Sequence, residues 1–218
     1  MPATAGLVAL AAFAGLTVAV TTSRAVTAFD LSIVMWAETH RIASATWLAV
    51  WVSRLGGPSI VSAYAAVLLV ALVWRGHLLM AVGVALIVYG GIGLNVAVKY
   101  LVHRGRPAGT DALVHLVTYS YPSGHAAAAT MFGGVLTVLL LARARRSAAT
   151  IACIVVVSLW ITAVCASRVY LGAHYPTDVV AGVLEGIAWL LLASLALRHW
   201  HIVINWKRAA NVARRKDP

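Results

Sequence analysis

The segment 167–178, between two long apolar runs, carries polar residues whose types and spacing could do chemistry. Asp178 follows His174 by four positions, which is about one helical turn. If a helix begins near Pro176, because proline is well placed in a first turn, the carboxylate can reach the imidazole. A carboxylate on one ring nitrogen fixes the tautomer and leaves the other nitrogen free as a nucleophile. Arg168 supplies a fork of donors suited to a tetrahedral oxyanion such as phosphate.

Taken alone, this segment could equally be a solvated loop at a membrane edge, but two further segments have matching chemistry. Lys99 and Arg106 end one apolar run and add two cationic donors. The run Tyr-Pro-Ser-Gly-His at 121–125 opens another apolar run, whose first backbone N–H groups and positive helix end would favour an anion. There Gly124 lets the backbone approach closely and the Ser123 hydroxyl can donate.

Together, the motifs K-x6-R-P, P-S-G-H and S-R-x5-H-x3-D resemble the three-part signature of the type 2 phosphatidic acid phosphatase superfamily. That family also includes glucose-6-phosphatase, bacterial lipid phosphatases and vanadium haloperoxidases. All three motifs are complete and in the family's order, within residues 99–178.

The resemblance implies a role for each signature residue. It implies that His174 attacks phosphorus to form a phosphohistidine, that Asp178 orients it, and that His125 protonates the leaving alcohol and then activates water. It implies no metal and no other cofactor, because basic residues neutralise the phosphate. The implied phosphate-binding residues are Lys99, Arg106, Ser123, Gly124 and Arg168.

Composition indicates an integral membrane protein. Of the 218 residues, 62% are hydrophobic and 11% charged, whereas a soluble domain carries about a quarter charged residues. There is room for six helices of about 20 residues each. We therefore expect an all-α bundle of six transmembrane helices, with an interfacial amphipathic helix at 29–57 between the first two. The expected spans are about 6–20, 59–74, 78–98, 125–141, 148–166 and 179–197, with a polar loop at 99–121.

The sequence predicts one transmembrane phosphatase domain, 1–218, with a basic cytoplasmic tail at 199–218. The first apolar run could also be a signal peptide, since Val26-Thr27-Ala28 weakly resembles a cleavage site. Cys153 and Cys165 would lie on one helix, too far apart for a disulfide.

The distribution of basic residues predicts the orientation. Six spans place all three motifs on one side of the membrane. The opposite loops and tail carry ten Lys and Arg residues, against four on the motif side once the signature cations Lys99, Arg106 and Arg168 are set apart. This positive-inside bias predicts a multi-pass protein of the bacterial cytoplasmic (inner) membrane, with the active site facing the periplasm or cell exterior.

Several alternatives remain at this point. The formal charge of +11 is not arranged as a nucleic-acid groove, so we expect no nucleic-acid partner. Arg104 could be an interfacial cation, and a zinc site of His103, His115 and His125 lacks metal-ligand spacing. Asn95 and Glu185 share helix faces with Lys99 and Asp178, respectively, but have no assigned role.

The expected function is metal-independent hydrolysis of a lipid phosphate at the membrane–water boundary, with His174 exposed at the site. Candidate substrates are phosphatidic acid, phosphatidylglycerol phosphate, a polyprenyl pyrophosphate and a phosphorylated lipid A. The alternatives are a lipid phosphotransferase with the same intermediate and, in another class, an anion-binding transporter. The sequence predicts no oligomeric state.

Overall fold

The computed structural model describes residues 2–108, 112–114, 117–143 and 147–214. These residues form helices and connecting loops without a β-strand, which confirms the all-α fold class. In chain order the helices are α1 (Pro2–Thr22), α2 (Arg24–Thr39), α3 (Ala43–Leu55), α4 (Pro58–Trp74), α5 (Leu78–Ala85), the π-helical η1 (Leu86–Gly90), α6 (Gly91–Val102), α7 (Gly124–Arg143), α8 (Ala148–Tyr170) and α9 (Pro176–Arg214).

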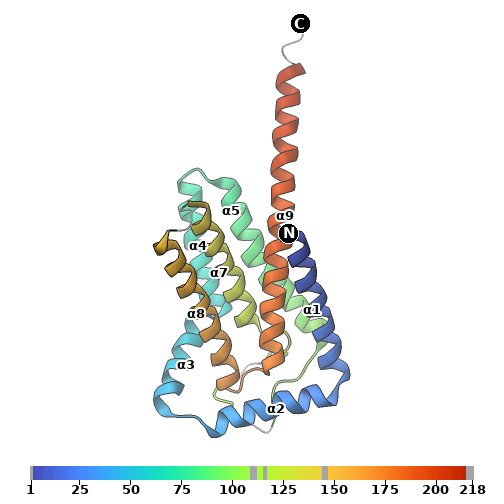
Figure 1. The fold of residues 1–218 in the computed structure, drawn as a ribbon, viewed down its shortest axis with the longest axis vertical. Helices are drawn as coiled ribbons and strands as arrows, with labels where there is room; N and C mark the ends of the chain where they lie inside the picture. The colour runs from blue at the N-terminus through green and yellow to red at the C-terminus, as the bar shows by residue number, and fades with distance from the viewer. Residues whose placement is uncertain (1, 109–111, 115–116, 144–146, 215–218) are drawn as a thin grey trace.

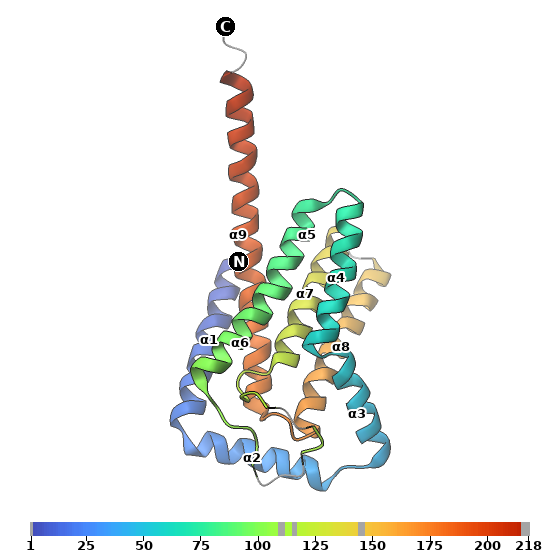
Figure 2. The same ribbon diagram turned by 180° about the vertical axis from the view of Figure 1, so that it is seen from behind.

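The long helices stand side by side, and α2 lies across one end of the bundle (Figures 1 and 2). Within the described residues, five stretches are long and apolar enough to cross a membrane, and α3 with α4 forms a sixth candidate span bent by 47°. Helices α5, η1 and α6 together make one of the five, Leu78–Val102. The chain is therefore a multi-pass membrane bundle, as the sequence predicts.

The region expected to be one amphipathic helix, 29–57, contains two helices, α2 and α3, which turn at His40 to Ile42. Helix α2 buries Asp30 and Val34 on one face and exposes Phe29 and Trp36 on another. This pattern is amphipathic, and its location at a membrane surface stays a prediction.

Three helix boundaries position the side chains of the site. Two of them lie beyond the expected helix ends, and the third is where the sequence predicts it. Helix α6 continues to Val102, so Lys99 lies in its last turn rather than in the expected polar loop. Helix α8 continues to Tyr170, which places Arg168 in its last turn as well. Helix α9 begins at Pro176, as predicted. The side chains carrying the chemistry are therefore anchored mainly on helix ends.

Close packing brings α9 against the start of α7. A Cβ atom at Gly182 would collide with the carbonyl oxygen of Ser123. The missing side chain thus lets α9 approach the second motif directly. The expected domain division and cytoplasmic tail stay predictions: the backbone of α9 continues to Arg214, and side chains beyond residue 197 lie outside the described part of the chain.

Candidate active site

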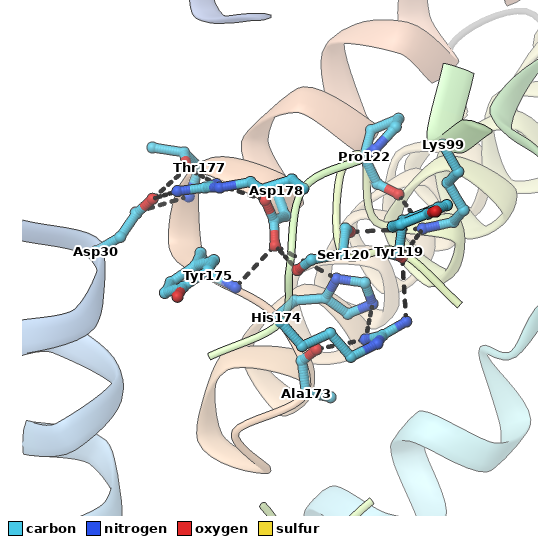
Figure 3. Close-up of polar contacts among 12 residues, drawn as sticks. Asp30, Lys99, Tyr119, Ser120, Pro122, Ala173, His174, Tyr175, Thr177 and Asp178 are labelled. Carbon is cyan, nitrogen blue, oxygen red and sulfur yellow. Dashed lines mark hydrogen bonds and ion pairs between the residues drawn. The ribbon is translucent and has the colours of Figure 1, made fainter. Parts of the chain in front are cut away.

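The three sequence motifs meet at the end of the bundle that α2 crosses (Figure 3). Backbone hydrogen bonds join them: Ser123 N donates to Asp178 O at 2.9 Å, and Ser120 N donates to Arg104 O at 2.8 Å. Leu113 N also donates to Leu171 O at 3.1 Å, which ties the two polar loops together. Segments far apart in sequence thus form one rigid polar region.

His174 and Asp178 face each other across the first turn of α9. The Nδ1 atom of His174 lies 3.6 Å from Asp178 Oδ2, just beyond hydrogen-bond distance. The same carboxylate oxygen accepts hydrogen bonds from Ser120 Oγ and, at 3.0 Å, from Tyr175 N. Asp178 is therefore fixed in place, and its position favours the tautomer with the proton on Nδ1 and the lone pair on Nε2.

The expectation that His174 is exposed is wrong, because its side chain is 1% exposed. Burial lowers the pKa of the imidazole from 6.5 to about 4, although the nearby negative charge of Asp178 acts to raise it. The charges of Arg106 and Arg168 lower the same pKa further. A neutral imidazole at pH 7 is the form that a nucleophile needs.

Arg168 is a buried cation with unused donors. It is 1% exposed, and its Nη1 donates to Ser53 Oγ on α3. Its Nε and Nη2 atoms are buried without a hydrogen-bond partner, as is the hydroxyl of Ser123. Buried polar atoms of this kind are rare in folded proteins unless a ligand or water completes them. Their donor chemistry fits an oxyanion.

Arg106 and Lys99 have more contacts than Arg168. Arg106 Nη1 lies 3.4 Å from His174 Nε2 and donates to Ala173 O at 2.5 Å. Burial lowers the pKa of Arg106, and the charge of Asp178 opposes this. Lys99 Nζ donates to Pro122 O at 2.6 Å and to Tyr119 O at 3.0 Å. Lys99 thus shapes the loop before α7 as well as bringing positive charge to it.

His125 and Gly124 lie at the beginning of α7. The Nε2 atom of His125 is 3.3 Å from the point where a Cβ of Gly57 would lie. A Cβ at Gly124 would meet Asn95 Oδ1 at 3.1 Å and Lys99 Cε at 3.9 Å. Glycine at both positions keeps the backbone close to the reacting groups.

Two residues that the sequence analysis leaves outside the signature, Arg104 and Asp30, also join the site. Arg104 is therefore not merely an interfacial cation: its Nη1 donates to Asp178 Oδ1 at 2.6 Å, and its Nη2 donates to Asp30 Oδ2 at 2.7 Å. Burial would lower the pKa of Arg104, but the charge of Asp178 and hydrogen bonds to both carboxylates raise it. Asp30 also accepts from Thr177 N at 3.1 Å and from Thr177 Oγ1.

Spacing alone cannot find Asp30, since 74 positions separate it from Arg104. Its only signal is an acidic residue within an otherwise apolar turn of an amphipathic helix. For the hydroxyls of Ser53 and Ser120, in contrast, the sequence holds no signal.

A family model described as the PAP2 superfamily matches residues 77–201, more than half of the chain and all three motifs. The chain belongs to the PAP2 superfamily. It is similar to the crystal structure of a transmembrane PAP2-type phosphatidylglycerolphosphate phosphatase from Bacillus subtilis, at 25% identity and a TM-score of 0.77. The match covers 87% of this chain and 94% of that one. A comparison with curated proteins gave no match.

Membership of the PAP2 superfamily and this structural neighbour make the protein a membrane-embedded phosphatase. Within the described residues, no three His, Cys, Asp or Glu side chains form a group that could bind a metal ion. Of the zinc alternative, His103 packs edge-on against Tyr119 and His115 lies outside the described residues. Both cysteines are free thiols.

Proposed function

We propose that this PAP2-superfamily phosphatase hydrolyses a lipid phosphomonoester or pyrophosphate without a metal, through a phosphohistidine on His174. The observation that carries the proposal is the set of buried, unpartnered donors on Arg168 and Ser123 beside a neutral, buried His174. A phosphate dianion would complete those donors, and three cationic side chains would neutralise it.

In the first step, the Nε2 lone pair of His174 forms a bond to phosphorus while the bond from phosphorus to the alcohol oxygen breaks. Asp178 stabilises the positive charge that develops on the ring, because its carboxylate faces Nδ1. His125 gives its proton to the departing alcohol oxygen. Lys99, Arg106, Arg168 and the N–H groups of Ser123 and Gly124 bind the phosphoryl oxygens.

In the second step, His125, now neutral, takes a proton from water. The water oxygen bonds to phosphorus as the bond to Nε2 breaks, which releases phosphate and restores His174. This step separates the leading proposal from the closest rival. A lipid hydroxyl in place of water would make the protein a phosphotransferase with the same residues.

A lipid substrate is supported by an apolar cavity beside the site. This cavity has a volume of about 140 Å³ and lies between α4, α6 and α7, with Lys99 at its wall and Ile92, Val96 and Ala127 among its apolar lining. An alkyl chain that follows the phosphate would fit there. The solved neighbour acts on phosphatidylglycerolphosphate, which supports phosphatidylglycerol phosphate among the candidates alongside phosphatidic acid and polyprenyl pyrophosphate.

We further propose that the site faces the periplasm or cell exterior, on the basis of the ten-to-four distribution of basic residues. A cysteine replacing exposed Ala108, in a variant without the native cysteines, should react with an impermeant thiol reagent on intact cells. A cysteine replacing exposed Ser147 should react only after permeabilisation. The reverse pattern would overturn the orientation.

The proposed function is tested by trapping the intermediate. Purified protein, mixed with a phosphorus-labelled lipid phosphate in EDTA and quenched in base, should carry acid-labile label, and His174→Ala should carry none. His125→Ala should accumulate label from a substrate with an activated leaving group, because the first step then needs no acid. Turnover that requires zinc or magnesium, or label retained in His174→Ala, would contradict the mechanism. Transport of an anion without hydrolysis would favour the transporter alternative.

A further inference from the structure

Asn95 and Glu185 have no part in the mechanism above, and their geometry points to a second recognition site beside the phosphate. We propose that Asn95 accepts a hydrogen bond from a substrate hydroxyl on the carbon next to the one that bears the phosphate ester. Glu185 is the positioning residue that turns the Asn95 amide for this contact. The inference rests on the proposed hydrolysis of a lipid phosphate.

The orientation of the Asn95 amide follows from its partner. Asn95 Nδ2 donates to Glu185 Oε2 at 2.6 Å, between α6 and α9. Both side chains are almost fully buried, at 4% and 3% exposure. In this contact the NH₂ group of Asn95 faces Glu185, as donation to an ionised carboxylate requires, and its Oδ1 faces away.

The Oδ1 atom is directed toward the reacting region. It lies 3.1 Å from the point that a Cβ of Gly124 would occupy, and Gly124 is the first residue of α7, whose N-terminus faces the phosphate site. Asn95 also lines the cavity that Lys99 and Gly124 line. Among the described residues, no donor hydrogen-bonds to Oδ1.

One oxygen of the neighbouring Glu185 carboxylate also lacks a hydrogen-bond donor. Glu185 Oε1 is buried without a hydrogen-bond partner, so the pair as a whole is short of donors. A buried acceptor left without a donor is destabilising by about 1–3 kcal/mol.

The chemistry of the cavity restricts the class of ligand. Apart from Lys99, Asn95 and Thr118 its lining is apolar, so the group there must be mainly alkyl with one hydroxyl near the phosphate. Phosphatidylglycerol phosphate and lysophosphatidic acid carry a hydroxyl on the carbon next to the phosphorylated carbon. Phosphatidic acid and polyprenyl pyrophosphates carry none. The site should therefore favour the first pair.

The test compares two substrates that differ in one hydroxyl: 1-acyl-glycerol-3-phosphate and its 2-deoxy analogue, both in mixed micelles. For the wild type we expect kcat/KM to be about tenfold higher with the hydroxyl present, the effect of one hydrogen bond. Asn95→Leu should bring the ratio to about one, by slowing only the hydroxylated substrate. The double variant Asn95→Leu/Glu185→Leu leaves no buried polar group unpaired and should give the same ratio.

Glu185→Gln separates recognition from packing. The glutamine has the same shape, but its NH₂ group can donate to Asn95 Oδ1 and let the amide turn, so the ratio should fall although the bundle remains folded. Trp189→Phe is the matched control, because it removes a different hydrogen bond between α9 and the same span, from Trp189 Nε1 to Ile87 O at 3.1 Å. Its ratio should stay near that of the wild type.

A wild-type ratio of about one would overturn the proposal while leaving the phosphatase function intact. The proposal also fails if the double variant keeps the tenfold preference, or if Trp189→Phe lowers the ratio as much as Glu185→Gln. Failure of the wild type to hydrolyse either substrate, or any other lipid phosphate, would instead contradict the proposed function itself.

Discussion

Two arginines of the site, Arg104 and Arg168, differ in what they bind. Arg104 donates to two carboxylates, at 2.6 Å to Asp178 and 2.7 Å to Asp30. Arg168 donates to the neutral hydroxyl of Ser53 and keeps Nε and Nη2 unpartnered. A cation saturated with carboxylates has little left for a substrate, whereas a buried cation with free donors is stabilised when an anion arrives.

The difference suggests that the two arginines have different roles: Arg104 stabilises the structure, and Arg168 binds the ligand. Asp30 lies on α2, so Arg104 fastens the helix that crosses the bundle end to the carboxylate behind the nucleophile. Arg168 lies in the last turn of α8, and no carboxylate among the described residues forms an ion pair with it. Function and stability should therefore respond to these two residues in opposite ways.

The largest expected effect is on catalysis at Arg168. Arg168→Gln should lower kcat/KM by about 10³-fold, since it removes preorganised donors that stabilise the charge on the transferring phosphoryl group. Its thermal stability should stay equal or rise, because a buried charge without a counter-ion is removed. Steady-state kinetics and a melting curve in the same detergent measure both. A less stable variant with normal kcat/KM would contradict this role.

The next effect is on stability at Arg104. Arg104→Gln leaves two buried carboxylates unpaired and should destabilise the fold by about 3–5 kcal/mol. Asp30→Asn should cost less, and the double variant should cost less than the sum, by about 1–3 kcal/mol of coupling. Arg54→Gln, a change at an exposed arginine beside Trp51, is the control and should be nearly neutral. Additive effects of the two changes would exclude the coupling.

These two residues also show what could be predicted from sequence. The role implied for Arg168 followed from its place in a spaced motif, and the helix start at Pro176 followed from local turn chemistry. The bond from Arg104 to Asp30 depends on how α2 docks across the bundle end, which no local pattern encodes. The expected exposure of His174 was wrong for the same reason. Its neighbours include residues distant in sequence, such as Arg106, whose Nη1 lies 3.4 Å from His174 Nε2.

A smaller effect is expected from ligand binding. Vanadate adopts the five-coordinate geometry of phosphorus under attack, and at about 100 times its Kd it should stabilise the wild type by about 2.7 kcal/mol. This gain should disappear in Arg168→Gln and persist in Arg104→Gln, although the latter starts from a lower melting temperature. EDTA should change neither curve. Equal loss of the gain in both variants would show that the two arginines do not divide their roles.

A further effect, which is gradual in pH, concerns the protonation of His174. Burial lowers its folded pKa to about 4 from 6.5, so between these values the unfolded chain binds up to one more proton than the folded one. The contribution of this residue to stability is therefore complete above pH 6.5 and is lost as pH falls toward 4, at no more than about 1.4 kcal/mol per pH unit.

Nitrogen-resolved NMR of the wild type measures this pKa. The imidazole signal of His174 is assigned by its absence from the spectrum of His174→Gln, and in the wild type it should titrate near 4. In Arg104→Gln it should titrate at higher pH, because the charge of Asp178 is then no longer shared with a guanidinium. A titration near 6.5 in the wild type would mean that the imidazole is not desolvated by burial, and an unchanged one in Arg104→Gln would mean that Arg104 does not moderate the Asp178 charge.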